Sequence, residues 1–205
     1  MPAMAPGRRH PDWQALYERA VETTLPWHFP ALDPDVKREL QGIRPKVGTL
    51  LEVGCGLGNQ AHYLRELGCE VTATDISQAA IQRARSAYPE VEFLVDDITQ
   101  TGLCGKYEMV VDRGCFHVLD PKHHEGYLQS VHKLLQPMGL CLLKAFSNEQ
   151  GQGEFGPHRF SLLGLIRVFT PYFEVLKIRR TVYQGSIPHP HRAWFAVLRK
   201  KELYV

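Results

Sequence analysis

The chain lacks any apolar run long enough to span a bilayer, and its N-terminus lacks the apolar stretch of a secretion signal. Its five cysteines include no C-x-x-C pair, which argues against a zinc site of the usual spacing and against a disulfide framework. A formal net charge of +2 gives no electrostatic reason to expect nucleic acid or a membrane surface as a partner. We therefore expect a cytoplasmic protein with reduced thiols, without a nucleic-acid or membrane partner.

Size and composition favour one soluble domain. A chain of 205 residues can bury a full core, and 44% hydrophobic with 22% charged residues is ordinary for a globular protein. No internal repeat or low-complexity linker divides the chain. We expect one compact unit, a monomer or homodimer, in which residues 1–45 form an N-terminal helical lid and residues 46–205 form the main α/β domain.

Two helices are predicted ahead of any strand. Apolar residues from Trp13 to Val21 recur at helical spacing on one face, and Asp33-Pro34 provides a capping residue followed by a first-turn proline. Between them, residues 25–30 read Leu-Pro-Trp-His-Phe-Pro, which is a stiff aromatic segment. This segment and the two helices together form the predicted lid.

After the first helices, predicted strands and helices alternate. The strands are expected at residues 49–53, 70–74, 91–95, 108–112, 140–146, 174–183 and 194–199, and the helices at residues 60–67, 78–86, 121–135 and 162–169. Such alternation indicates an α/β fold with a mostly parallel sheet and helices on both faces. No helix separates the last two strands, so we expect them to pair antiparallel at one edge of a seven-stranded sheet.

The strongest motif is the segment L-L-E-V-G-C-G-L-G-N at residues 50–59. An apolar strand ends in an acid, and Gly54, Gly56 and Gly58 then lead into a helix. Glycines at these points let the backbone turn sharply and approach a ligand that a side chain would block. The dinucleotide-binding spacing G-x-G-x-x-G is absent because position 59 is Asn. A nicotinamide or flavin dinucleotide is therefore not the expected ligand.

The pattern E-x-G-x-G-x-G after a buried strand resembles the signature of the class I S-adenosylmethionine-dependent methyltransferases. The resemblance implies a single Rossmann-like domain, S-adenosylmethionine as the cofactor, and transfer of a methyl group. It also implies that Gly54, Cys55, Gly56 and Gly58 form a floor for the aminocarboxylate arm and the adenosine of the cofactor. Glu52 would act through this loop or through a water molecule.

Acidic residues end each of the first four predicted strands, at the sheet edge where ligands of such folds bind. By the same resemblance, Asp75 holds both ribose hydroxyls, and Ile76 packs on the adenine. Asp97 is expected to accept the adenine amino group, with the Ile98 N–H facing a ring nitrogen. Asp96 is the alternative if the register differs by one residue.

A second segment narrows the resemblance. Residues 107–117, Y-E-M-V-V-D-R-G-C-F-H, resemble a subgroup that includes thiopurine and thiol methyltransferase-like enzymes and tellurite-resistance-type methyltransferases. Trp13-x-x-x-Tyr17, Pro26-Trp27 and residues 156–161 match other parts of that pattern. The subgroup implies a small-molecule acceptor and favours a thiol or another chalcogen nucleophile.

Methyl transfer from a sulfonium is an in-line displacement, so the nucleophile must lie opposite the leaving sulfur with water kept out. Trp27 and Phe29 are the candidates for an aromatic enclosure, Trp27 beside the cofactor and Phe29 beside the substrate. The alternative for Trp27 is a structural role in which it ties the first helices to the core.

His117 and Asp112 are the candidate catalytic residues, because they lie at and just after the end of the fourth strand. An ordinary histidine pKa of about 6.5 suits proton removal near neutral pH, whereas a buried structural histidine is the alternative. Asp112 and Arg113 are also assigned to the cofactor, although Arg113 could instead hold an anionic substrate or pair with Asp112. His158 and Arg159 are candidate substrate residues.

Other interpretations stay open at this point. We expect no metal site, because the ten histidines include no H-x-x-x-H pair on a predicted helix. O- or N-methylation of a small metabolite is the alternative reaction; a thiol, with a pKa of about 8.5, needs a base less than an alcohol does. Macromolecule modification is disfavoured because the N/D-P-P-[YF] motif is missing after the fourth strand. A non-catalytic cofactor-binding module is disfavoured by the complete set of cofactor motifs.

Overall fold

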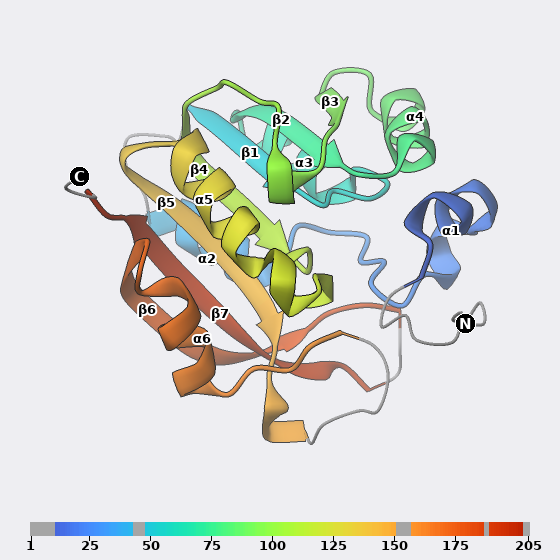
Figure 1. Ribbon diagram of the computed structural model, residues 1–205. Coiled ribbons are helices and arrows are strands. Elements are labelled where there is room, and N and C mark those ends of the chain that lie inside the picture. The colour runs from blue at the N-terminus through green and yellow to red at the C-terminus, as the bar shows by residue number, and fades with distance from the viewer. Residues whose placement is uncertain (1–10, 43–47, 151–156, 187–188, 203–205) are drawn as a thin grey trace.

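One seven-stranded sheet organises the protein (Figure 1). The computed structural model describes residues 11–42, 48–150, 157–186 and 189–202. The helices are α1 (Trp13–Arg19), α2 (Pro34–Gly42), α3 (Asn59–Glu66), α4 (Gln78–Ala87), α5 (His124–Leu134) and α6 (Leu162–Phe169). The strands are β1 (Thr49–Val53), β2 (Glu70–Asp75), β3 (Glu92–Val95), β4 (Tyr107–Arg113), β5 (Leu135–Phe146), β6 (Phe173–Tyr183) and β7 (His191–Lys200).

The sheet has the order β3-β2-β1-β4-β5-β7-β6. Neighbouring strands from β3 to β5 pair in parallel, and β7 runs antiparallel to both β5 and β6. This confirms the predicted α/β fold, a mostly parallel sheet whose last strand is antiparallel. The strand order changes direction at β1, because β2 and β3 lie on one side of it and β4 and β5 on the other. A topological switch point therefore lies at the carboxyl ends of β1 and β4.

Hydrophobic clusters cover both faces of the sheet. On one face, α5 and α6 contribute Tyr127, Val131 and Phe169 to a fully buried cluster. On the other face, α2, α3 and α4 cover the strands, and Val36 of α2 is 2% exposed there. Figure 1 shows α5 and α6 in front of the sheet and α2 behind it. The predicted N-terminal region therefore contributes α2 to the core of the main domain.

Local signals in the sequence set several helix ends. Asp33 accepts a hydrogen bond from the Asp35 N–H at 2.9 Å, and Ser161 accepts one from the Gly164 N–H at 3.0 Å, as expected for the caps of α2 and α6. α6 ends at Phe169, two residues ahead of Pro171. Val36, Leu40 and Ile43 are spaced as one helical stripe in the sequence, and the last of these positions lies outside the described residues. Within the described ranges, no helix combines the length and apolarity needed to cross a membrane.

The segment before the fifth strand differs from the prediction. The expected helix at residues 121–135 is divided into a short 3-10 turn, Pro121–His123, and α5. Asp120 caps the turn through the Lys122 N–H, which fixes its tighter geometry. β5 begins at Leu135 and not at Leu140, because Leu135 pairs with Tyr107 across an irregularity in the ladder. Within that stretch Met138 has a φ of 62°, a left-handed value usually reserved for glycine.

Candidate active site

The glycine loop lies between β1 and α3 at the carboxyl edge of the sheet. Gly54, Gly56 and Gly58 have φ values of 65°, 54° and 85°. A Cβ on Gly58 would lie 2.6 Å from Cζ of Phe93, and one on Gly54 would lie 2.7 Å from Cβ of Cys115. The loop thus needs glycine both for its backbone angles and for its close packing. Cys55, between them, is buried in the core, so only its backbone faces the loop.

Asp75 ties the glycine loop to the end of β2. Its Oδ2 accepts a hydrogen bond from the Gly56 N–H and its Oδ1 accepts one from the Ser77 N–H, both at 2.9 Å. Burial raises the pKa of this carboxyl group. Each oxygen retains a lone pair, so Asp75 can bind a hydroxyl-bearing ligand while holding the loop.

Glu52 is a buried acid at the start of the same loop. Its Oε2 has no hydrogen-bond partner among the described residues, and the side chain is 3% exposed. Burial raises its pKa to about 8, although the nearby Arg113 opposes that shift. A buried carboxyl oxygen without a hydrogen-bond partner costs free energy, so a ligand that forms a hydrogen bond with it would relieve that cost.

Apolar side chains are exposed beside this acid cluster. Ile76, directly after β2, is 56% exposed, and Val95 at the end of β3 is 51% exposed. β2 and β3 are neighbours, and Asp75 pairs with Val95 in the ladder. These two residues therefore offer an apolar surface next to Asp75, of the kind that a purine face covers.

Asp96 and Asp97 have different roles at the end of β3. Asp97 accepts hydrogen bonds from the Thr99 N–H, the Thr99 hydroxyl and the Gln100 side chain, so it caps the 3-10 turn Ile98–Gln100. Burial opposes the shift, but these bonds lower the pKa of Asp97. Asp96 Oδ2 is buried with no hydrogen-bond partner among the described residues. The carboxylate oxygen that can still accept a hydrogen bond therefore belongs to Asp96, the alternative to Asp97. The Ile98 side chain is buried in the core, which leaves only its backbone for a ligand.

The N-terminal helix covers the glycine loop. The Tyr17 hydroxyl lies 2.7 Å from the point that a Gly56 Cβ would take. Gln14 Oε1 accepts hydrogen bonds from the Ser77 hydroxyl at 3.2 Å and from the Ala79 N–H at 3.1 Å, which docks α1 on the start of α4 (Figure 1). Sequence analysis assigned no site role to Gln14 or Tyr17. The i, i+4 spacing of Trp13 and Tyr17 was the available signal for Tyr17, and none existed for Gln14.

Trp27 lies between two groups of aromatic side chains at this edge of the sheet. Its ring makes edge contacts with Trp13 at 5.7 Å and Tyr17 at 6.4 Å between centroids. It also packs against the cluster of Phe146 and Tyr183, at the ends of β5 and β6. Trp27 thus joins the aromatic residues of α1 to those at the ends of β5 and β6.

Asp112 is fully engaged in shaping the turn after β4. Its carboxylate accepts hydrogen bonds from the N–H groups of Gly114, Cys115 and Phe116 and from the Tyr127 hydroxyl, at 2.7–2.9 Å. Burial raises its pKa to about 6, and those bonds oppose the shift. The structure therefore gives the predicted catalytic and cofactor-binding residue a turn-forming role.

His117 is not the ordinary histidine that the sequence suggested. It is 3% exposed, and its Nδ1 accepts a hydrogen bond from the Phe146 N–H at 3.2 Å. Burial, with the charge of Arg113 nearby, lowers the pKa of His117 to about 3. A neutral imidazole that already accepts a backbone hydrogen bond is a poor proton acceptor at neutral pH. The expectation of a pKa suited to proton removal was wrong.

Of the other candidate substrate residues, the structure brings His158 to His117 and Phe29 to Arg113. The His158 N–H donates to the His117 carbonyl at 2.7 Å, so the loop after β5 reaches the turn after β4. Both His158 and Arg159 are partly exposed. Phe29 faces the Arg113 guanidinium, with its ring centroid 5.8 Å from Cζ.

Arg113 belongs to a buried ion network, and its acidic partner is Asp33 and not Asp112. Its Nε donates to Asp33 Oδ2 at 2.9 Å, its Nη1 to the Trp27 carbonyl at 3.1 Å, and its Nη2 to the Gln184 carbonyl at 2.6 Å. The predicted pairing with Asp112 is therefore wrong, because the guanidinium points toward the N-terminal segment. Its assignment to the cofactor stays a prediction.

Lys144 is the functional candidate that sequence analysis missed. Its ammonium group is completely buried and lies 2.7 Å from Asp33 Oδ2, 2.8 Å from Asp35 Oδ2 and 2.7 Å from Gln184 Oε1. Asp35 also contacts Arg179 at 2.9 Å. Burial would raise the pKa of Asp35, but the Lys144 and Thr181 hydrogen bonds lower it. We call Asp33, Asp35, Arg113, Lys144 and Arg179 the buried ion network.

The residues at this edge suit a nucleoside with a proton-donating arm. The glycine loop leaves space for backbone contact, Asp75 and Asp96 present carboxylate oxygens, and Ile76 presents an apolar surface. Glu52 Oε2 adds a buried polar atom in need of a hydrogen-bond partner. Across the described part of the chain, no group of three or more His, Cys, Asp or Glu residues is arranged to hold a metal ion.

Comparison with known proteins gives the same assignment. Residues 50–139 match the family model described as a methyltransferase domain. A 2-heptyl-1-hydroxyquinolin-4(1H)-one methyltransferase of Mycobacteroides abscessus is 29% identical over 158 residues, which is 73% of this chain and 69% of that protein. An uncharacterised methyltransferase of Schizosaccharomyces pombe is 33% identical over 103 residues, which is 48% of this chain and 71% of that protein.

A solved structure has the same fold along nearly the whole chain. The structure described for the conversion of a disulfide bond into a thioacetal group during echinomycin biosynthesis superposes with a TM-score of 0.78. The match covers 92% of this chain and 91% of that one, at 22% identity. The glycine loop, the acids at the ends of the first four strands and the sequence relatives agree, so the chain belongs to the class I S-adenosylmethionine-dependent methyltransferases.

Proposed function

We propose that this methyltransferase acts on a small molecule whose nucleophile is a thiol or another chalcogen. The observation that carries the proposal is the state of His117, which is buried, neutral and already hydrogen-bonded through Nδ1. His124 and His191, on the same side of the edge, also have pKa values lowered by burial. A nucleophile that ionises by itself suits such surroundings better than one that needs a base.

The chemistry of thiols agrees with this requirement. A thiol with a pKa of about 8.5 provides some thiolate at neutral pH, whereas an alcohol needs proton removal at the moment of attack. S-adenosylmethionine supplies the methyl group from a sulfonium, whose positive charge is lost during transfer. An enclosure of aromatic rings with few charges suits the disappearance of that charge. The narrower resemblance of residues 107–117 to thiol and tellurite methyltransferases supports the same acceptor class.

We further propose roles for the cofactor-side residues. Asp75 would bind the ribose hydroxyls, and Ile76 would pack on the adenine, for which its exposure beside Asp75 is the support. Asp96 would accept the adenine amino group, because Asp97 already caps a turn. Glu52 would form a hydrogen bond with the aminocarboxylate arm, directly or through a water molecule.

The segment at residues 11–30 is proposed as the lid. Tyr17 lies on Gly56, and Trp27 lies between the aromatic groups of the two halves of the edge. These positions support a role in covering the methyl donor and excluding water. The proposed lid stops ahead of α2, because Val36 of that helix packs in the core.

A hydroxylated ring is the second candidate acceptor. The relative from Mycobacteroides abscessus is named for a 1-hydroxyquinolone, and this chain covers 69% of it. The Phe146, Tyr183 and Trp27 rings beside His117 would suit a flat acceptor of that kind. Because no general base is assigned at this edge, the hydroxyl of such an acceptor must ionise readily by itself.

The proposal is tested by labelled-methyl transfer to matched acceptors. The panel holds an aromatic thiol, the corresponding phenol and aniline, and a 1-hydroxyquinolone, each with wild type and His117→Gln. Glutamine can still accept the Phe146 N–H through its side-chain oxygen. We expect the thiol to be the best acceptor and its turnover to stay within about threefold in the variant.

Two outcomes would overturn the thiol assignment. One is a loss of roughly 100-fold or more for the thiol in His117→Gln, the size expected for removal of a general base. The other is transfer to the hydroxyl or amine acceptors without transfer to any thiol. The pH profile adds a check, since thiol turnover should rise toward a pKa of about 8.5 and not toward 6.5.

A further inference from the structure

The buried ion network connects the lid to the carboxyl edge of the sheet. Asp33 follows the lid segment, caps α2, and has its carboxylate completely buried between Lys144 and Arg113. We propose that Arg113 and Lys144 are positioning residues for methyl transfer, which hold the segment carrying Trp27 and Phe29 in its closed place over the methyl donor. This proposal rests on the assignment of that segment as the lid.

Arg113 joins three segments that are far apart in sequence. Its three contacts reach Asp33 ahead of α2, the Trp27 carbonyl in the lid, and the Gln184 carbonyl after β6. The guanidinium is planar, and its donors are fixed relative to one another. The position of the Trp27 peptide is therefore set by the end of β4, where Arg113 is anchored.

Aromatic contacts and a backbone hydrogen bond fix Arg113 itself. Its Cζ lies 4.6 Å from the centroid of the Tyr183 ring and 5.8 Å from that of Phe29. The Tyr183 hydroxyl donates to the Arg113 carbonyl at 2.7 Å. Both the backbone carbonyl and the guanidinium of Arg113 are thus fixed. A shift of the lid must therefore break the hydrogen bond between Arg113 and the Trp27 carbonyl.

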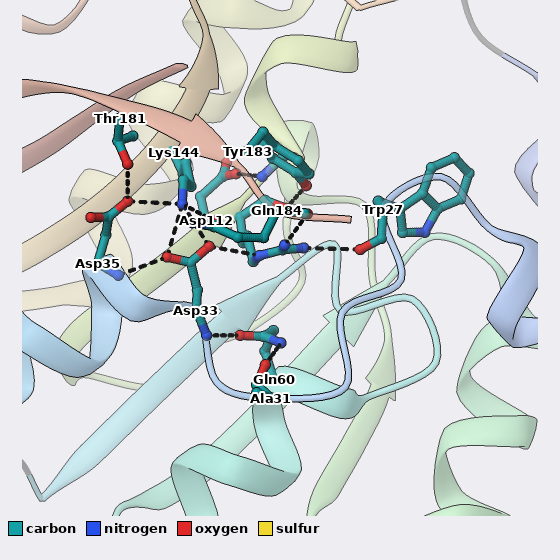
Figure 2. Close-up of polar contacts among 12 residues, drawn as sticks. Trp27, Ala31, Asp33, Asp35, Gln60, Asp112, Lys144, Thr181, Tyr183 and Gln184 are labelled. Carbon is teal, nitrogen blue, oxygen red and sulfur yellow. Dashed lines mark hydrogen bonds and ion pairs between the residues drawn. The ribbon is translucent and has the colours of Figure 1, made fainter. Parts of the chain in front are cut away.

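Lys144 orients Asp33, the acid with which Arg113 forms its ion pair. Its three ammonium protons are matched by Asp33, Asp35 and Gln184 Oε1. Figure 2 shows Lys144 pointing from β5 between Asp33 and Asp35. Gln184 accepts a hydrogen bond from Lys144 at its side-chain oxygen and one from Arg113 at its backbone carbonyl. The two cations therefore share both Asp33 and Gln184 as partners.

Stability alone is a weak reason for these charges to be buried. Replacing a buried ion pair with well-packed apolar residues is often neutral or stabilising, whereas a satisfied network favours one arrangement of its parts. Here the network contacts the Trp27 carbonyl through Arg113, and Arg113 directly follows Asp112 in the chain. A role in fixing the place of the lid explains both its location and its composition.

The test is Arg113→Lys, measured by calorimetric binding of S-adenosylhomocysteine and by the kinetics of S-adenosylmethionine. Lysine keeps the positive charge beside Asp33 but lacks the fork that reaches two carbonyl groups. We expect the Kd for S-adenosylhomocysteine to rise about tenfold, because the closed lid is populated less and apparent affinity falls with that fraction. kcat/KM for the methyl donor should fall by a similar factor, with KM carrying most of the change.

Lys177→Met is the matched control. Lys177 also pairs with an acid of α2, Glu39 at 2.8 Å, but it is 49% exposed and that partner lies outside the lid segment. Its Kd for S-adenosylhomocysteine should equal that of wild type. If Arg113→Lys proves too unstable to assay, Asp33→Asn replaces it, because the amide keeps the α2 cap while losing the charge that Arg113 and Lys144 grip.

The variant Trp27→Ala separates failure of this proposal from failure of the lid assignment. If Trp27→Ala weakens S-adenosylhomocysteine binding while Arg113→Lys or Asp33→Asn binds like wild type, the lid stands and the positioning role is overturned. If all of them bind like wild type, the lid assignment fails and this proposal fails with it. A lower Tm with unchanged Kd and KM would assign the network to stability only.

Discussion

Replacing Lys144 with methionine should lower the free energy of unfolding by about 3 kcal/mol. Asp33 and Asp35 are 0% and 3% exposed, so both carboxylates would stay buried after the loss of their shared cation. Breaking a buried pair from one side costs roughly 3–5 kcal/mol. We expect the lower end, because Asp33 keeps Arg113 and Asp35 keeps Arg179.

Urea unfolding measures this effect, and the melting temperature should fall by about 10 °C in a domain of this size. Lys177→Met removes a half-exposed lysine of β6 that pairs with Glu39 of α2, and the loss of stability should stay below about 1 kcal/mol. Restoring neutrality with Asp35→Asn in the Lys144→Met background should recover part of the stability. A loss below about 1 kcal/mol in Lys144→Met alone would contradict the burial and pairing described for the network.

The second large effect concerns Glu52. In the unliganded protein, the free energy of unfolding of Glu52→Gln minus that of wild type should be about 3 kcal/mol larger at pH 8 than at pH 5. Burial raises the folded pKa of Glu52 from 4.5 to about 8. The folded protein therefore holds a proton that the unfolded chain has released between these pH values, and stability is lost as the pH rises through that window. Glutamine has no such proton to lose.

Comparing wild type and variant at both pH values isolates this term, because any constant cost of the amide cancels. Glu174→Gln makes the same chemical change on a half-exposed residue of β6 and sets the baseline for the exchange. We also expect Glu52→Gln to bind S-adenosylhomocysteine more weakly while being more stable, as in sites where strain is kept for a ligand. An equal change of stability with pH in wild type and Glu52→Gln would rule out the raised pKa.

The fold followed from local signals. Apolar runs bounded by glycine, proline and capping acids predicted the five parallel strands, because buried parallel strands must be apolar along their length. The two strands that pair antiparallel at the edge were predicted as well. Asp33 and Ser161 marked helix starts by the same local chemistry. The early start of β5 was not predicted, because Pro137 and Gly139 resemble a turn, and only pairing with β4 extends the strand through them.

The site was predicted in position but only partly in role. The glycine loop and Asp75 could be located because their spacing reflects one strand–loop–helix unit. The roles of Arg113, Lys144 and His117 depend on long-range packing: Asp33 is 80 residues from Arg113 and 111 from Lys144 in sequence. A lysine within the apolar stretch at residues 140–146 was a usable signal, since a buried ammonium requires a buried acid. The sequence could not identify which acid.

Titration of wild type and Asp75→Ala with S-adenosylhomocysteine tests most directly whether the methyl donor lies across the carboxyl ends of β1 and β2. Wild type should bind one equivalent, and Asp75→Ala should bind more weakly by roughly 1–3 kcal/mol, since it loses charge-assisted hydrogen bonds. Asp120→Ala, which removes an exposed capping acid, should bind like wild type. No binding by wild type, or equal affinity in wild type and Asp75→Ala, would contradict the account.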